Sequence, residues 1–254
     1  MIARGIVLVS GSLADKPARL VSPAEPVELV SDPPPFVSRG GQKLRAALDR
    51  FGIDPTDRRA LDAGASTGGF TDCLLQAGAA QVVAVDVGHG QLHPKLRDDP
   101  RVVSHERVDI RSVTLDTVGG VPVDLVVADL SFISATRAVP VITGTVVSPG
   151  APLVVLVKPQ FEAGRVEASR GRGVIRDPEV HRRTLGEVAT ALEDAGAVIM
   201  GAMPSPLTGH SGNVEFLLYA RTPDPARSGN AAPVGPMLDA AVAEAHRAEV
   251  GAGD

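Results

Sequence analysis

The sequence predicts an α/β fold built on a mostly parallel, seven-stranded sheet with an antiparallel edge strand. Apolar runs of strand length alternate with segments of helix length, which is typical of a parallel sheet with helices on both faces. Two further apolar runs close the pattern, and we expect them to pair antiparallel at one edge of the sheet. The predicted strands lie near residues 58–63, 81–86, 102–106, 123–129, 152–158, 198–203 and 214–220.

A shorter unit precedes this domain. Two short strands are predicted over Ile6–Ser12 and Val27–Val30, with a turn between them, which is too little to fold alone. The prolines at 33, 34 and 35 form a stiff run that indicates a linker. The predicted organisation is a front segment, a proline-rich linker, the α/β domain and a flexible tail with a short helix, over residues 1–32, 33–37, 38–221 and 222–254.

The clearest helix follows Asp177. Pro178 lies in its first turn, apolar residues recur at helical spacing, and Gly196 is a stop signal. Residues 222–235 are rich in Pro, Gly, Ala and Ser, which indicates a flexible connection to a last helix over residues 236–249.

The composition is that of an ordinary globular protein. The chain has 254 residues, of which 44% are hydrophobic and 22% charged, enough for one good core. Its single cysteine, Cys73, cannot form an internal disulfide, which favours a reducing, cytoplasmic location. The longest apolar runs have the length of a strand, so we expect no signal peptide and no membrane span.

The formal net charge of −5 means that an RNA backbone would have to be bound by local basic patches. For any single arginine in the candidate patches, ordinary solvated surface charge is an equally good interpretation. The candidate patches are the cluster Arg39, Lys43 and Arg45 and the loop that carries Arg165, Arg170, Arg172 and Arg176.

The most informative stretch is a glycine-rich turn, DAGASTGGF at residues 62–70, which follows an apolar run and opens a helix. Asp86 closes the next apolar run, where an acidic residue suits the hydroxyls of a ribose. The spacing G-x-x-x-G-G lacks the second glycine that admits a pyrophosphate in dinucleotide-binding turns. A cofactor without phosphates is therefore favoured, S-adenosylmethionine (SAM) above all. Three glycines let the backbone turn sharply and approach a ligand closely: Gly64, Gly68 and Gly69.

Three other interpretations stay open. Residues 64–68 also match the G-x-S-x-G nucleophile elbow of α/β-hydrolases, although that leaves Asp86 without a role. A turn of this kind can also be structural, with no ligand. His89 and His93 have a spacing that suggests a metal site, but the stretch between them lacks the Glu of a zinc protease and begins in a glycine turn. No metal is therefore expected.

Charged residues lie where the predicted strands end. Ligands of open α/β sheets bind at the carboxyl ends of the strands, so we expect these side chains to converge at one edge. A charge at the end of an apolar run is also normal at a solvent boundary, so each residue alone is a weak signal. The residues are Asp62, Asp86, Asp109, Asp129, Lys158 and Glu215.

Several motifs together resemble the TlyA-type rRNA 2'-O-methyltransferases, also known as the haemolysin A family. The resemblance covers residues 36–221 almost continuously and implies a Rossmann-like class I methyltransferase domain of the FtsJ type. It also implies SAM as cofactor, ribosomal RNA and ribosomal subunits as partners, and an S4 RNA-binding domain, of which the front segment resembles only the second half. The motifs are SRGGQKL (38–44), the turn at 62–70, VDVGHGQL (85–92), DLSFIS (129–134), LVKPQFE (156–162) and SGNVE (211–215).

The resemblance further implies a Lys-Asp-Lys-Glu catalytic tetrad and a set of cofactor contacts. A ribose 2'-hydroxyl is a poor nucleophile, so the enzyme must orient it and remove its proton; Lys158, in its neutral form, is the candidate base. The tetrad consists of Lys43, Asp129, Lys158 and Glu215. The cofactor contacts are Gly64, Ser66, Gly68, Gly69 and Phe70 around the methionine part, Asp86 at the ribose and Asp109 at the adenine amine. Asp62, Thr67 and Asp129 complete the set, without a particular part of the cofactor assigned to them.

The expected reaction is methylation of a cytidine ribose in 23S rRNA, with 16S rRNA as a second substrate. Its two rivals are a membrane-active haemolysin and an RNA-binding protein without catalysis. The sequence argues against the first because it has neither a spanning segment nor a strongly cationic amphipathic helix. It argues against the second because all four tetrad positions are intact.

Overall fold

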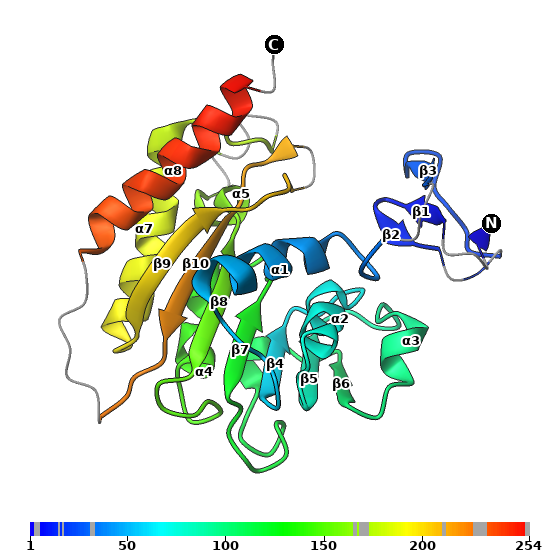
Figure 1. The fold of residues 1–254 in the computed structure, drawn as a ribbon, viewed down its shortest axis with the longest axis horizontal. Helices are drawn as coiled ribbons and strands as arrows, with labels where there is room; N and C mark the ends of the chain where they lie inside the picture. The colour runs from blue at the N-terminus through cyan, green and yellow to red at the C-terminus, as the bar shows by residue number, and fades with distance from the viewer. Residues whose placement is uncertain are drawn as a thin grey trace.

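The computed structural model describes residues 1–2, 6–14, 16, 18–30, 34–164, 167, 173–209, 212–225 and 233–251. Its centre is a seven-stranded sheet in the order β6-β5-β4-β7-β8-β10-β9 (Figure 1). The predicted α/β fold is confirmed. The strands are β4 (Arg59–Ala63), β5 (Gln81–Asp86), β6 (Val102–Glu106), β7 (Leu125–Ala128), β8 (Pro152–Val157), β9 (Val198–Pro204) and β10 (Phe216–Arg221).

The order of the strands creates a switch point in the middle of the sheet. The strands from β4 to β8 run parallel, whereas β10 is antiparallel to both of its neighbours, β8 and β9. From β4 the chain moves outward to β5 and β6, and it then returns to place β7 on the other side of β4. The carboxyl ends of β4 and β7 therefore flank the crevice in which open α/β sheets bind their ligands.

Helices cover both faces of the sheet (Figure 1). They are α1 (Gly40–Phe51), α2 (Gly69–Gln76), α3 (Pro94–Arg97), α4 (Val139–Ile142), α5 (Pro159–Glu162), α7 (Pro178–Asp194) and α8 (Val234–Gly251), with the 3₁₀ turns η2 (Ile110–Ser112) and η3 (Ala135–Arg137). Leu44 of α1 and Leu74 of α2 belong to one hydrophobic cluster, and Leu185 of α7 and Leu238 of α8 belong to the other. All residues of β7 and β8 are buried between these layers, which explains why their sequences are continuous apolar runs.

The front segment forms a small antiparallel sheet of three strands, in the order β2-β1-β3. The strands are β1 (Val7–Val9), β2 (Ser12–Leu13) and β3 (Val27–Leu29). The prediction of a single strand over residues 6–12 is wrong, because Ser10 and Gly11 both have positive φ angles, of 51° and 78°, as in a two-residue hairpin turn. The assignment of this segment to an S4-like domain stays a prediction.

The small sheet adjoins the main domain at the α2 and α3 end of the molecule (Figure 1). An isolated bridge pairs Ser12 with Ser38, and the Leu13 N–H donates to the Val37 carbonyl at 3.3 Å. Its own core is slight, since its buried hydrophobic cluster consists of Val7, Val9 and Ala14. The segment therefore depends on the main domain, as its length predicts. Pro33 of the predicted linker lies outside the described residues.

Two helix boundaries illustrate how local sequence sets the elements. Helix α7 begins after Asp177, whose side chain accepts the Glu179 N–H at 2.9 Å, as an N-cap should. Helix α8 begins at residue 234, two residues before the predicted start. Pro236 lies in its first turn, where a backbone N–H would have no helical partner, so the proline is tolerated there.

Among the described residues, no helix combines the length and the apolar character that crossing a membrane requires.

Candidate active site

Two cavities open at the switch point. The larger, of about 330 Å³, is lined by residues from the ends of β4, β5 and β7 and from the loop after β6. The smaller, of about 110 Å³, lies between the glycine-rich turn and the start of α1. Gly64, Ser66 and Asp129 line both cavities. Of the other predicted residues, the larger holds Asp86 and Asp109, and the smaller holds Lys43, Thr67, Gly69 and Phe70.

The glycine-rich turn owes its shape to close backbone contacts. Gly64 has φ 89°, and a Cβ atom there would lie 2.5 Å from the Asp129 carbonyl oxygen. Any side chain at this position would therefore push β4 and β7 apart. Gly68, at φ 96°, packs against Leu92 and Leu96 near α3 and lines neither cavity. Its role in this structure is to allow packing.

The carboxylate of Asp86, at the end of β5, is fixed by two backbone hydrogen bonds. Its Oδ2 atom accepts the Ser66 N–H at 2.8 Å, and its Oδ1 atom accepts the Gly88 N–H at 2.6 Å. These bonds fix the carboxylate against the turn, and each oxygen retains a lone pair. Such an arrangement suits a ligand with two neighbouring hydroxyl groups.

Asp109 is oriented by Arg111. The Arg111 Nη2 atom lies 2.6 Å from Asp109 Oδ2, and the Arg111 backbone N–H donates to Oδ1 at 2.9 Å. These hydrogen bonds lower the pKa of Asp109 to about 2, so the carboxylate that lines the larger cavity is ionised at neutral pH. It can accept a hydrogen bond from a ligand amine but cannot donate one.

Asp62 differs from the other predicted residues because its side chain is completely buried and lines neither cavity. The Thr71 hydroxyl donates to its Oδ2 atom at 2.6 Å. Burial raises the pKa of Asp62 to about 7, and the charges of Asp129 and Asp86 contribute to the rise. Asp62 therefore joins β4 to α2 under the turn, with a proton that is partly retained at neutral pH.

The two lysines of the predicted tetrad each pair with one of its acids. Lys158, directly after β8, places its Nζ atom 2.5 Å from Asp129 Oδ1 and donates to Ser131 Oγ at 2.8 Å. The Lys43 Nζ atom of α1 lies 2.5 Å from Glu215 Oε2. Apart from Asp129, which is partly exposed, these side chains are buried. Both cations are thus paired in a largely water-excluded place, as buried charges require.

The register of the sheet brings the two pairs to the same edge. Phe216, the first residue of β10, lies opposite Val157, the last residue of β8. Glu215 comes just before Phe216 and Lys158 just after Val157, so both residues lie outside the sheet at the same edge. Lys43 and Asp129 also line the same small cavity. The four predicted tetrad residues are therefore brought together as two adjacent ion pairs.

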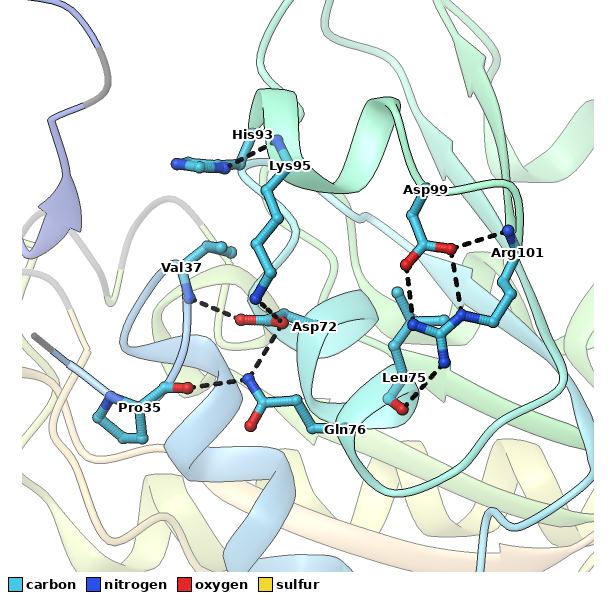
Figure 2. Close-up of polar contacts among 9 residues, drawn as sticks. All are labelled: Pro35, Val37, Asp72, Leu75, Gln76, His93, Lys95, Asp99 and Arg101. Carbon is cyan, nitrogen blue, oxygen red and sulfur yellow. Dashed lines mark hydrogen bonds and ion pairs between the residues drawn. The ribbon is translucent and has the colours of Figure 1, made fainter. Parts of the chain in front are cut away.

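A buried carboxylate that the sequence reasoning missed fixes the chain before α1 (Figure 2). Asp72 of α2 accepts the Val37 N–H at 2.9 Å and pairs with Lys95 at 3.3 Å. Gln76 donates to Asp72 at 3.1 Å and to the Pro35 carbonyl at 2.9 Å. The segment that leads into α1, and with it Lys43, is consequently tied to α2. The available signal was a charged residue in a short helix that is otherwise uncharged.

A second missed residue is Phe132, in the loop after β7. Its side chain is 88% exposed, its φ angle is 71°, and it lines the larger cavity. Its ring lies 5.7 Å from that of Phe161, over which the Lys158 Nζ atom lies at 5.7 Å. A positive φ in a non-glycine residue is strained and often marks a functional site. The signal was a phenylalanine just after the end of a predicted strand, in a chain with 3% aromatic residues.

The remaining candidate residues have other contacts. The Nη2 atom of Arg39 donates to the Thr208 carbonyl at 2.5 Å. His89 pairs with Glu106 at 2.7 Å, and His93 caps α3 by accepting the Lys95 N–H. Arg176 is exposed, whereas the predicted arginines at 165, 170 and 172 lie outside the described residues.

The part of the chain that carries this site matches a family of known proteins. The model of the family described as FtsJ-like methyltransferase matches residues 36–222. The chain belongs to the FtsJ-like methyltransferase family. This membership sets aside the hydrolase interpretation of the glycine-rich turn, and it confirms the methyltransferase domain that the motifs predicted.

Individual relatives of this FtsJ-like methyltransferase agree. The 16S/23S rRNA (cytidine-2'-O)-methyltransferase TlyA of Mycobacterium tuberculosis is 49% identical over 223 residues, which is 87% of this chain and 82% of the relative. A solved structure from Streptococcus thermophilus, described as a proposed hemolysin, is 36% identical with a TM-score of 0.81 and covers 97% of this chain and 88% of its own. The predicted resemblance to the TlyA-type proteins is confirmed.

A more distant solved structure shares the fold alone. The SAM-dependent methyltransferase of Mesorhizobium loti is 17% identical, with a TM-score of 0.52 over 70% of this chain and 97% of its own.

Proposed function

We propose that this protein transfers a methyl group from SAM to the 2'-oxygen of a cytidine ribose in 23S rRNA, with 16S rRNA as a second substrate. The observation that carries the proposal is the pair of Lys–carboxylate contacts, Lys158 with Asp129 and Lys43 with Glu215, beside a cavity lined by the glycine-rich turn. The named activity of the M. tuberculosis relative supports it. A cytoplasmic location follows from the proposed substrate.

The residues around the two cavities fit SAM. Asp86, fixed by two backbone N–H groups, would accept from the ribose hydroxyls, and Asp109 would accept from the adenine amine. Apolar walls at Ile110 and Ile133 suit the flat faces of the base. The methionine part would lie toward the smaller cavity, along Gly64, Ser66, Thr67, Gly69 and Phe70. When bound, SAM supplies an activated methyl group.

The tetrad supplies orientation and a place for the proton. The Lys158 ammonium has three N–H groups; it donates to Ser131 and forms an ion pair with Asp129, which leaves it able to contact a ribose hydroxyl as well. In its neutral form, Lys158 would accept the 2'-hydroxyl proton while the hydroxyl oxygen takes the methyl group and the demethylated cofactor leaves as a neutral thioether. Lys43, held by Glu215, orients the ribose in line with the methyl group.

Phe132 suits the role of a platform for the target base. Proteins that read unpaired RNA commonly stack splayed bases on aromatic side chains. Phe132 presents such a ring to solvent in the lining of the larger cavity, from a backbone with a positive φ angle. A base stacked on this ring would bring its ribose near Lys158.

The test is methyl transfer from labelled SAM to unmethylated large and small ribosomal subunits, followed by mapping of the modified nucleotide. We expect label on a cytidine 2'-oxygen, and labelling at least about 100-fold slower with the Lys158→Ala variant. Label on a base or on another sugar position would overturn the assignment. Cofactor binding without transfer to either subunit would refute the rRNA substrate, and leakage of liposomes would support the haemolysin alternative instead.

A further inference from the structure

Glu215 is held by a loop whose own anchor is Asn213. This loop connects β9 to β10; its described residues are 205–209 and 212–215, and they include Gly209. Asn213 is 2% exposed. Its Oδ1 atom accepts the Ile175 N–H at 3.0 Å, and its Nδ2 atom donates to the Gly173 carbonyl at 2.9 Å. One buried amide therefore joins the Glu215 loop to the segment just before α7.

The backbone of Asn213 also helps to position the Glu215 carboxylate, through a hydrogen bond to Gly209. The Gly209 N–H donates to the Asn213 carbonyl at 2.8 Å. A Cβ atom at Gly209 would overlap the Glu215 Oε1 atom, so the backbone of Gly209 lies directly against the carboxylate. Asn213 thereby fixes the Gly209 backbone, which packs against Oε1 of Glu215, while Lys43 pairs with Oε2.

The segment to which Asn213 is tied is itself fixed. The Ile175 carbonyl is bonded to Nε2 of His181 at 3.1 Å, and His181 is completely buried in α7. A connected series of contacts thus runs from α7 through Ile175 and Asn213 to Glu215. An amide buried with both its acceptor and its donor engaged orders the loop, because leaving the backbone groups that it binds buried and unpaired is unfavourable.

We infer that Asn213 is a positioning residue for the reaction, which acts by fixing Glu215 and hence the Lys43 ammonium. This inference rests on the proposed function for its kinetic consequence but not for its geometric one. Thr222 provides a matched control. It is also buried, accepts the Ala151 N–H at 2.9 Å and donates to the Ser148 carbonyl at 2.8 Å, but it follows the opposite end of β10 from Asn213.

The first measurement compares Asn213→Ala with Thr222→Val. With Asn213→Ala we expect kcat for methyl transfer to fall by about 10–100-fold, because small misplacements of reacting groups have effects of that size, with the Kd for SAM within about twofold of wild type. Thr222→Val should change kcat by less than about threefold. Equal losses in the two variants, or a parallel loss of SAM binding in Asn213→Ala, would overturn the inference.

A double-mutant cycle separates positioning from general destabilisation. If Asn213 acts through Glu215, adding Asn213→Ala to Glu215→Gln should lower kcat by less than about twofold further, because residues in one network are not additive. Additive losses would contradict the inference. If Asn213→Ala does not fold, Gly209→Ala disturbs the same carboxylate with the amide intact, and it should show the same non-additivity with Glu215→Gln.

A readout without activity distinguishes this inference from the proposed function. Lys43 is 7% exposed, so an amine-reactive reagent should label it slowly in the wild type. Asn213→Ala should accelerate labelling of Lys43, measured by mass spectrometry, and Thr222→Val should not. Unchanged labelling would refute the positioning role even if wild-type methyl transfer is confirmed, whereas faster labelling would support it even if the RNA substrate were wrong.

Discussion

The two Lys–carboxylate pairs of the site are built in different ways. Lys158 and Asp129 follow the adjacent parallel strands β8 and β7, so the sheet itself places them side by side. Lys43 and Glu215 come from a helix and from a connecting loop, and each depends on a separate buried contact, Asp72 for the approach to α1 and Asn213 for the loop. The first pair is thus fixed by strand register and the second by tertiary contacts, which makes the second more sensitive to distant changes.

Removal of Lys158, the lysine that strand register places, should have the largest effect on the reaction rate. Lys158→Ala is expected to lower kcat by about 10²–10⁴-fold, the range typical of a lost general base. The Kd for SAM should change little, because Lys158 lines neither cavity. Single-turnover methylation and calorimetric SAM binding check this. A variant that retains more than about a tenth of wild-type kcat would show that the sheet-held pair only orients the ribose.

Removal of the other lysine should affect both rate and stability. Lys43→Met leaves Glu215 buried without its cation, which costs about 3–5 kcal/mol when a buried pair is broken, and kcat should fall by about 10²-fold through lost orientation. Urea unfolding and kinetics on the same preparation measure the two effects. Lys43→Met combined with Glu215→Gln should recover part of the stability but not the rate, since no charge is then left unpaired. Recovery of neither would argue against the ion pair.

A change at Asp72 should affect one pair and spare the other. Asp72→Asn weakens the contacts to Val37 and Lys95, so we expect the unfolding free energy to fall by about 1–3 kcal/mol and kcat to fall by about 10-fold. Amine labelling of Lys43 should accelerate while that of Lys158 stays as in the wild type. Equal acceleration at both lysines would show that the two pairs are not held independently.

The last prediction concerns stability and its dependence on pH, not the reaction rate, and it involves Asp62 beneath the glycine-rich turn. Asp62 has a folded-state pKa of about 7, against about 3.9 in an unfolded chain. The folded state therefore retains a proton that the unfolded state loses, so this group lowers stability as the pH rises from about 4 to about 7, with no further change above 7. Asp62→Asn should flatten that slope in urea midpoints measured from pH 5 to 8.

Asp109→Asn is the control for this experiment. The pKa of Asp109 is about 2, below the tested window, so its replacement should leave the slope unchanged. Parallel stability curves for wild type and Asp62→Asn would contradict the assignment of a retained proton to Asp62.

The sequence predicts well which site residues lie at the ends of the parallel strands. Strand ends can be located from apolar runs, and parallel strands necessarily bring their carboxyl ends to one edge, so Asp86, Asp129 and Lys158 could be placed from pattern alone. The turn residues follow the same logic. Asp62 shows the limit, since a residue near a strand end can face inward to α2, as its bond to Thr71 shows.

The tertiary contacts could not be derived in this way. Asp72 and Asn213 act on backbone groups 35 and 38 residues away, and no local pattern specifies such partners. The hairpin at Ser10 was missed because a serine with positive φ breaks the usual association of that conformation with glycine. Phe132 was missed because exposure on a strained loop is a property of the folded chain.

The position of β10 has a consequence for how the protein is made. This strand lies between β8 and β9 in the sheet, yet it follows all the other described strands in the chain. A nascent chain can complete neither the sheet nor its second ion pair until residue 221 has left the ribosome, because Glu215 arrives with that strand. Assembly of the site therefore comes late, after β4 to β9 have been made, and a chain that lacks β10 has a glycine-rich turn but no complete tetrad.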